Sequence, residues 1–469
     1  MKSRCPFLSV FGLMIGIAGL AVPRPASADI FQWEYINPAA PSQGKQPSTT
    51  LAPGGAGLNA VPNADLSSAD LTMAWLIQAN LTSANFNATT LTNADLLSAT
   101  LISANFTGAD VRGANFAKTV DDEYSTNGLT AAQLYSTASY QNHDLSGINL
   151  GSNNLSGWNF AGQNLTNAKL GYKPTGFYPA ILTGANFAGA EVRGAELPGL
   201  SVAQLYSTAS YQNRDLSGIT LGTSISGANF AEQNLSNAAF YIFNSFYGTD
   251  FSHAILTNVR VIPFGANNFT GANLTAADAR GAQSFYPAGN TTTNLILPDG
   301  HVAGLDLTAG QSLLVSNYHG NPQVSPDPGP IAILIEQSMT MDSTGTLRLM
   351  LDGDEWDSLI SFAPGIPVSL GGTLELSFAA GVDVDGEIGR TFKLFDWTGV
   401  TPAGSFSVAS PHAWDLSRLY TSGEVTLIPE PAAICLIVPF ALLAARRTNR
   451  RQRPSSRSKK YGQGVGNLC

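Results

Sequence analysis

The chain has 469 residues, a length that allows two to four domains. Its formal net charge of −9 conceals a more acidic middle, because three basic residues lie in 1–28 and eight lie after residue 445. The part between them has 13 basic and 33 acidic residues, a charge of −20. Such a surface repels nucleic acids and anionic membranes and attracts cations or basic partners, so nucleic-acid binding is not expected.

Residues 1–28 have the three parts of a secretory signal peptide. Lys2 and Arg4 precede an apolar stretch, and a pattern of small residues ends at Ala26 and Ala28. We expect cleavage after Ala28, and an uncleaved membrane anchor is the alternative.

The three cysteines lie outside the body of the protein that remains after export. They are Cys5 in the predicted signal, Cys435 in a C-terminal apolar run and Cys469 at the last position. Residues 29–428, which we call the mature body, therefore contain no disulfide, no cysteine-based zinc site and no cysteine nucleophile.

Residues 29–63 are rich in Pro, Gly and Ser and are predicted to form a linker or an early cap. From residue 64 the chain repeats every five residues, and Ala stands two positions before a large apolar residue in ten of the first eleven repeats. A helix has a period of 3.6 and a strand a period of 2, so neither explains this pattern. The large positions are Leu66, Leu71, Leu76, Leu81, Phe86, Leu91, Leu96, Leu101, Phe106, Val111 and Phe116.

The pattern Ala-(Asp/Asn)-Leu-x-x resembles the pentapeptide-repeat family. The resemblance implies a right-handed quadrilateral β-helix, a solenoid with four repeats in each coil. Large side chains and Ala are then expected to point inward, while Asp, Asn, Ser, Thr and Gly turn the corners. Each coil buries its apolar residues only by stacking on the next coil.

The period continues more loosely, and we place the solenoid at 64–285 with inserts near 118–143 and 198–214. The segment AQLYSTASYQ occurs in both inserts, each time after a residue that can cap a short helix, Thr130 and Ser201. The tyrosines, at 135, 140, 206 and 211, can stack on a ligand or pack the insert on the coil, and we favour packing.

Residues 286–428 read as a β-rich domain. Segments such as GTLRLMLDG and GTLELSFAAG alternate apolar and polar residues between Gly, Pro and Asp turns. We expect six to eight strands in an antiparallel β-sandwich, so the fold class is all-β, and continuation of the β-helix is the alternative.

The segment 429–453 begins with Pro429, Glu430 and Pro431, continues with a short apolar run, and ends in a basic cluster that includes Arg446 and Arg447. A run of 14 residues covers roughly 21 Å as a helix, less than a bilayer core, so it predicts a weak one-pass anchor. These three parts in this order resemble a PEP-CTERM sorting signal. The resemblance implies recognition by an exosortase-type enzyme and a host that secretes polysaccharide. A basic tail, 454–469, follows, whereas the basic cluster usually ends such chains.

Few patterns in the chain indicate chemistry. The five histidines form no pair at helical spacing, and no nucleophile or phosphate-loop motif occurs. Two acidic clusters can supply calcium ligands, although neither fits an EF-hand and solvated turns are the favoured interpretation. The clusters are Asp352, Asp354, Glu355 and Asp357, and Asp383, Asp385 and Glu387. No catalytic residue, metal or cofactor is therefore predicted.

Three classes of function remain open. The favoured one is an exported, non-enzymatic protein of the cell surface or extracellular matrix, structural or adhesive, and associated with secreted polysaccharide. The others are a secreted polysaccharide-active enzyme that uses carboxylates of the β-rich domain, and an acidic solenoid that mimics DNA, which export disfavours.

Overall fold

The computed structural model describes residues 29–119, 127–171, 180–222, 225–242, 246–263, 271–287, 290–321, 327, 329–379 and 381–430. The chain divides into one compact unit that ends at Ile428 and a second unit from Pro429 onward. The predicted signal at 1–28, with Ala26 and Ala28, lies outside the described residues, as do Pro431, Arg446, Arg447 and the tail. Within the described part, no helix is both long and apolar enough to cross a membrane.

The five-residue repeat folds into a four-faced solenoid, which confirms the predicted architecture. Parallel bridges join Asp65 to Asn85, Asp70 to Thr90 and Trp75 to Asp95, and a fourth bridge closes the coil on the last face. The partners in each bridge are 20 residues apart, so one coil contains four repeats. Similar parallel bridges continue to the pair Asp278 and Ile296, with wider spacing where the chain carries inserts.

The interior of the solenoid is a stack of the predicted apolar residues. Each of these side chains is at most 2% exposed, because neighbouring coils in the stack cover them. The ten that we singled out are Leu66, Leu71, Leu76, Leu81, Phe86, Leu91, Leu96, Leu101, Phe106 and Phe116. Aromatic members stack directly between coils, as Phe86 and Phe106 do with ring centroids 4.9 Å apart.

Corners between faces place one residue of each repeat in the left-handed region. These residues are often not glycine: Met73 has a φ of 60°, Gln78 of 56° and Ala88 of 56°. Left-handed geometry costs a residue with a side chain about 1 kcal/mol, so the coil geometry is imposed by stacking rather than by local preference.

Short helices and strands interrupt the solenoid. The helix caps predicted at Thr130 and Ser201 are present, and each side chain accepts a hydrogen bond from a backbone N–H of its helix as part of a capping box. The helices are α1 (Ala131–Tyr135), α2 (Ala138–Gln141), α3 (Val202–Tyr206) and α4 (Ala209–Gln212). One face widens into a parallel sheet of β3 (Glu196–Leu197), β4 (Thr220–Leu221), β5 (Ala239–Ile242) and β6 (Arg260–Pro263).

An antiparallel hairpin lies before the first coil. It is formed by β1 (Phe31–Tyr35) and β2 (Lys45–Leu51), with the 3-10 turn η1 (Pro41–Gln43) between them. The hairpin attaches to the coil edge, because the Trp33 N–H donates to the carbonyl of Met73 and the indole N–H to that of Asn93. Lys45 lies over the ring of Trp33 and forms a 2.7 Å ion pair with Asp95.

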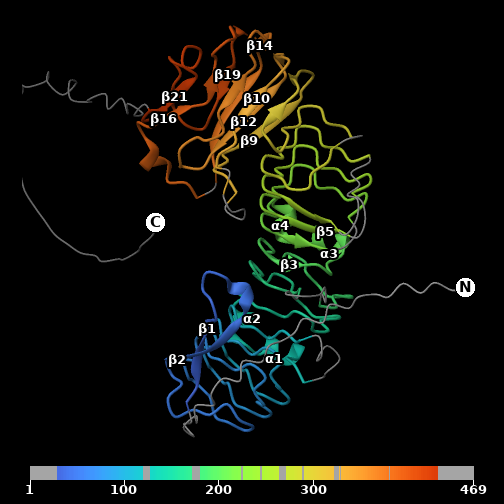
Figure 1. The fold of residues 1–469 in the computed structure, drawn as a ribbon, viewed down its shortest axis with the longest axis vertical. Helices are drawn as coiled ribbons and strands as arrows, with labels where there is room; N and C mark the ends of the chain where they lie inside the picture. Colours follow the sequence, from blue (N-terminus) through green and yellow to red (C-terminus); the bar gives the residue numbers. More distant parts are fainter. Residues whose placement is uncertain are drawn as a thin grey trace, which may run out of the picture. The chain divides into compact units, whose positions relative to one another are not determined.

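Beyond the solenoid the chain forms a second stack of coils with three faces (Figure 1). Each face is a parallel sheet with one strand from each successive coil. The first face has β7 (His301–Val302), β10 (Ile333–Ile335), β13 (Ile360–Phe362) and β17 (Phe395–Asp396). The second has β8 (Leu305–Leu307), β11 (Met339–Met341), β14 (Val368–Leu370) and β18 (Ala403–Gly404). The third has β9 (Ser312–Ser316), β12 (Thr346–Leu351), β15 (Thr373–Phe378) and β19 (Ser407–Ala409).

This arrangement corrects the antiparallel sandwich expected at 286–428. All-β structure and alternating burial are found, as in β12, but neighbouring strands run in the same direction. Alternation tells only that one side of a strand is buried, and this holds equally for an antiparallel pair and for the wall of a solenoid. The parallel strand pairing fits continuation of the β-helix, the alternative expectation, better than it fits an antiparallel sandwich.

Two further features complete this part. An antiparallel sheet combines β16 (Thr391–Lys393), which lies between β15 and β17 in the chain, with β21 (Glu424–Leu427) and β20 (Trp414–Asp415). The 3-10 turn η3 (Val384–Glu387) precedes β16. At the other end, the fully buried Arg280 joins the two stacks. Its guanidinium lies 2.6 Å from Asp278 and donates to the hydroxyl of Ser358 and the carbonyl of Ser316.

Candidate functional site

Tyrosines of the two inserts serve packing, the interpretation that the sequence favoured. The rings of Tyr135 and Tyr140 lie 4.5 Å apart, and both hydroxyls contact the backbone of Asn159. The Tyr135 oxygen accepts from the Asn159 N–H at 2.6 Å, and the Tyr140 hydroxyl donates to the Asn159 carbonyl at 2.9 Å. The two phenol groups thus bond the backbone N–H and carbonyl of Asn159, as a neighbouring strand would.

The second insert repeats this tyrosine clamp. Tyr206 accepts from the N–H of Asn229 and Tyr211 donates to its carbonyl, at 2.6 and 2.8 Å. Burial and the adjacent Tyr206 raise the pKa of Tyr211 to about 12. The same geometry in both copies indicates a structural role for these tyrosines rather than a ligand platform.

One cluster of side chains does combine groups that can perform chemistry. It contains His319, Asp352, Asp354 and Asp357, and it lies in the two turns that follow β9 and β12. These strands are adjacent and parallel, with Ser316 opposite Met350. Residues that follow them are therefore brought to the same edge, although 33 positions separate His319 from Asp352.

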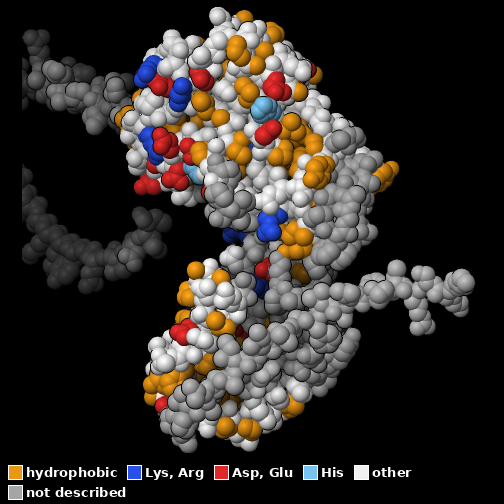
Figure 2. All heavy atoms as spheres, in the orientation of Figure 1, with side chains coloured by type: hydrophobic (Ala, Val, Ile, Leu, Met, Phe, Trp, Pro, Cys, Tyr) orange, Lys and Arg blue, Asp and Glu red, His pale blue; other side chains and the backbone are white. Residues whose placement is uncertain are grey.

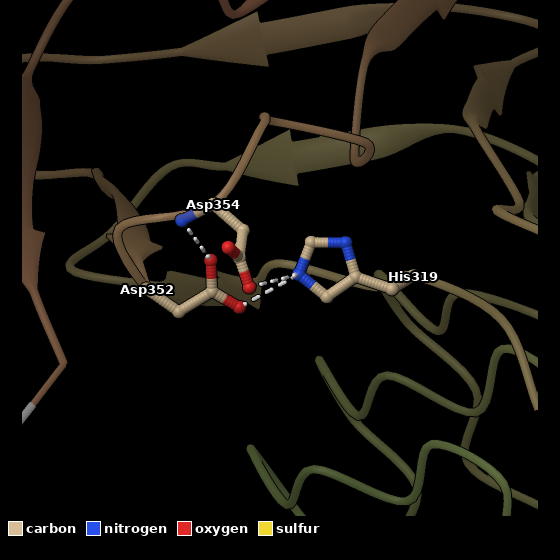
Figure 3. Close-up of side chains that lie close together, drawn as sticks. All are labelled: His319, Asp352 and Asp354. Carbon is tan, nitrogen blue, oxygen red and sulfur yellow. Dashed lines mark hydrogen bonds and ion pairs between the residues drawn. The ribbon is translucent and has the colours of Figure 1, made fainter.

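Both ring nitrogens of His319 face carboxylates. Nδ1 lies 2.7 Å from an oxygen of Asp357. Nε2 lies 3.0 Å from Asp352 and 3.8 Å from Asp354 (Figure 3). Partial burial alone would lower the pKa of His319, but the hydrogen bonds to Asp357 and Asp352 raise it above its ordinary value.

Asn317 holds the cluster in place. Its side-chain oxygen accepts from the backbone N–H of Asp357 at 2.8 Å, and its amide nitrogen donates to Asp352 at 3.0 Å and to the carbonyl of Glu355 at 2.7 Å. Burial raises the pKa of Asp352, but hydrogen bonds from Asn317 and His319 lower it below its ordinary value overall. One amide thus connects the two turns, so the carboxylates stay in position around the imidazole.

The Nε2 atom and one oxygen of each of Asp352 and Asp354 lie within 4.8 Å of one another, a separation that one metal ion can bridge. The same groups can move a proton, because an imidazole lies between carboxylates. The acids are visible in the sequence as a cluster, but their histidine partner is far from them along the chain. A usable signal existed: Asn317-x-His319 and Asp352-x-Asp354 each follow an alternating apolar strand directly.

The second acidic cluster does not converge in the same way. Its members lie in or beside η3, and Glu387 forms a 2.7 Å ion pair with Arg390. Pro429 and Glu430, the described residues of the predicted sorting motif, are exposed directly after β21.

Figure 2 shows a largely uncharged surface on the described part of one face, with most charged side chains over the β-rich region. The histidine cluster, directly after β9 and β12, belongs to this β-rich region.

Comparisons with known proteins agree with the five-residue period. The family model for pentapeptide repeats matches residues 79–116 with eight copies. A solved structure similar to this chain is HetL, a pentapeptide repeat protein involved in heterocyst differentiation regulation from the cyanobacterium Nostoc sp. strain PCC 7120. The two are 21% identical over 51% of this chain and 87% of HetL, with a TM-score of 0.17. No curated protein matches. The chain therefore contains pentapeptide repeats, which fold here as a β-solenoid.

Proposed function

We propose that this chain is an exported, non-enzymatic protein of the cell surface or extracellular matrix, and that it acts as a rigid structural element associated with secreted polysaccharide. The proposed location is supported by the signal-like residues 1–28 and by the resemblance of 429–453 to a PEP-CTERM sorting signal. An exosortase-type enzyme and the membrane would be its partners during sorting.

The observation that carries the structural role is the outer surface of the solenoid, where polar side chains bond to their own coil and to the next one. Asp65 accepts from both the N–H and the hydroxyl of Ser67, and also from the amide of Asn85. Asn105 continues the same row by donating to Asn85 at 3.0 Å. Each bond is weak on its own, but repetition makes every coil fix its neighbours.

This bonding also limits what the surface can recognise. Many Asn and Asp groups already have partners within the molecule, so a glycan meets mainly the remaining hydroxyls and amides. Contacts with a regular polysaccharide should therefore be individually weak and should gain strength through repetition. Support for a rigid spacer is stronger than support for a specific receptor.

An enzyme acting on polysaccharide is the second candidate, and one observation favours it. His319 has Asp357 at one ring nitrogen and Asp352 at the other, the kind of arrangement that can transfer protons. Other described histidines have simpler surroundings, such as His143 beside the amide of Gln163.

Activity assays on the host's own polysaccharide separate the two candidates. We expect the purified full-length chain to show no hydrolase or lyase turnover and only weak, multivalent binding. Turnover that disappears in Asp352→Ala or His319→Ala but persists in His301→Ala would establish the enzyme instead.

Removal of residues 429–469 tests the location. Because the compact unit ends at Ile428, the truncated protein should fold and appear in the medium, whereas the full chain should be retained at the cell surface. Retention of the truncated protein in the membrane fraction would contradict the proposed sorting role.

A further inference from the structure

The turns after β9 and β12 present one imidazole nitrogen and two carboxylates to a common point. We propose that His319, Asp352 and Asp354 bind one divalent transition-metal ion, through Nε2 and one oxygen of each carboxylate (Figure 3). The proposal concerns the β-rich region alone and does not depend on the proposed surface function.

The separations between the ligand atoms suit a single ion. Zinc bonds to histidine nitrogen and carboxylate oxygen are about 2.0–2.2 Å long. Two ligands on a tetrahedral ion are therefore roughly 3.4 Å apart. The Nε2 atom lies 3.0 Å from Asp352 and 3.8 Å from Asp354, values on either side of that distance. Small rotations of the Asp352 and Asp354 side chains are enough to bring all three ligand atoms to bonding distance of one ion. The fourth coordination position of the ion then stays open to water.

The outer contact of the imidazole also fits a metal ligand. A histidine that binds a metal through one nitrogen commonly donates its other N–H to a carboxylate, which fixes the tautomer and the ring orientation. Asp357 occupies that position, 2.7 Å from Nδ1. With the ring proton on Nδ1, Nε2 has a free lone pair, and this nitrogen faces Asp352, Asp354 and the amide nitrogen of Asn317, which lies 3.2 Å away.

The donor set selects the class of ion. Calcium takes six to eight oxygen ligands and magnesium retains water in an octahedron of oxygens, so one imidazole with two carboxylates suits neither well. Imidazole and carboxylate together suit zinc, manganese, cobalt and nickel. A positive ion is also favoured electrostatically, because among the described residues His319 is the only basic side chain paired with Asp352, Asp354 or Asp357.

The chain provides a matched control nearby. His301 on β7 forms a 2.8 Å contact with Glu336, directly after β10, and both side chains are as exposed as His319. This pair has an imidazole with a single carboxylate. It therefore reproduces the histidine–carboxylate contact of the proposed site without the second carboxylate that would complete the metal ligands.

Binding of Zn²⁺, and of Co²⁺ as a visible spectroscopic probe, tests the proposal in the full-length chain after treatment with a chelator. We expect wild type and His301→Ala to bind one more equivalent of Zn²⁺ than His319→Ala does. Asp354→Ala should lose the same equivalent, and because this side chain is 79% exposed its removal should leave the melting temperature of the metal-free protein unchanged. Asp357→Asn should weaken binding by about 10–100-fold.

The outcomes that would overturn the proposal are equally definite. They are equal Zn²⁺ stoichiometry in wild type, His319→Ala and Asp354→Ala, or loss of the extra equivalent in His301→Ala. A Co²⁺ spectrum without bands from a bound ion in wild type would do the same. If His319→Ala does not fold, the comparison of wild type with Asp354→Ala decides alone.

Discussion

The solenoid of pentapeptide repeats and the β-rich region both bury their apolar residues by stacking coils, but the lengths of their coils differ. In the solenoid, partners on neighbouring coils are regularly 20 residues apart, as for Asp65 and Asn85. In the β-rich region, Ser312, Thr346, Thr373 and Ser407 are paired in turn, which gives spacings of 34, 27 and 34 residues. Both regions stack parallel strands, but only the solenoid contains consecutive coils of constant length, in the bridges that run from Asp65 to Asn115; further along the chain its inserts change the spacing.

The difference shows what makes a solenoid recognisable in a sequence. A constant coil length repeats the inward position at a fixed interval, so the period itself predicts the fold. Variable turns remove that period but leave the strand pattern unchanged. The β-rich region therefore looks like any other set of half-buried strands.

The largest expected effect is the loss of stability when a charge is placed in the interior of the solenoid. Leu96→Asp places a carboxylate in an apolar stack where Leu96 is 1% exposed, and should cost about 5 kcal/mol or more. Ile102→Asp makes the same kind of change at a residue that is 46% exposed, and should change stability by about 0.5 kcal/mol or less. Thermal unfolding of both variants measures the difference, and equal shifts would contradict the inward stack.

The next largest effect concerns an Asp–Arg ion pair that occurs once on the surface and once buried. Asp110 and Arg112 pair on the solenoid surface, and Asp278 and Arg280 form the same pair, fully buried, where the two regions meet. Arg280→Met should cost about 3–5 kcal/mol, because it leaves the carboxylate of Asp278 buried without its partner. Arg112→Met should cost about 1 kcal/mol or less, since Arg112 is half exposed.

Denaturant titration measures both arginine variants. Similar losses in the two would show that the buried pair does not hold the junction. A loss in Arg280→Met accompanied by separate unfolding of the two regions would strengthen the view that this pair joins them.

A smaller effect tests the corners. Ala88 has a φ of 56°, so Ala88→Gly should relieve left-handed strain and stabilise the solenoid by about 1 kcal/mol. Ala188 is also exposed but lies outside the left-handed set, so Ala188→Gly should destabilise by about 0.5–1 kcal/mol. The same substitution is thus expected to raise the melting temperature at one site and to lower it at the other.

The smallest effect concerns the tyrosine clamp. An unfolded tyrosine ionises near pH 10, whereas the pKa of Tyr211 in the fold is about 12. The unfolded chain therefore loses this proton first, and the stabilisation is present below pH 10 and lost as the pH rises toward 12. Wild type should lose melting temperature over this range more steeply than Tyr211→Phe, and parallel pH curves would argue against the clamp.

Local signals predicted the solenoid because each repeat contains its own evidence. The inward residues and both helix caps followed from the pattern around Leu96, Thr130 and Ser201, whereas four repeats per coil followed from the family resemblance. The tyrosine contacts could be assigned only as packing or ligand binding, because nothing in the sequence shows that Tyr135 reaches the backbone of Asn159.

The histidine cluster and the burial of Arg280 depend on which coils stack on each other and in which register. The pairing of Ser316 with Met350 brings His319 to Asp352, and variable coil length hides that register. Arg280 in ADARGA and Arg112 in ADVRGA have nearly the same sequence neighbours. The burial of Arg280 therefore arises from the β-rich region stacking on it, which no local pattern reports.

Parallel stacking in the β-rich region is the central structural claim, and disulfide trapping tests it most directly. In a chain with Cys435 and Cys469 replaced by Ser, the pair Met350→Cys and Ser377→Cys should cross-link on mild oxidation, because these residues are opposite each other on β12 and β15. Thr346→Cys with Ser377→Cys should not, since four residues of offset separate them by about 13 Å along the strands. Cross-linking of the second pair and not of the first would show antiparallel strands and contradict the account.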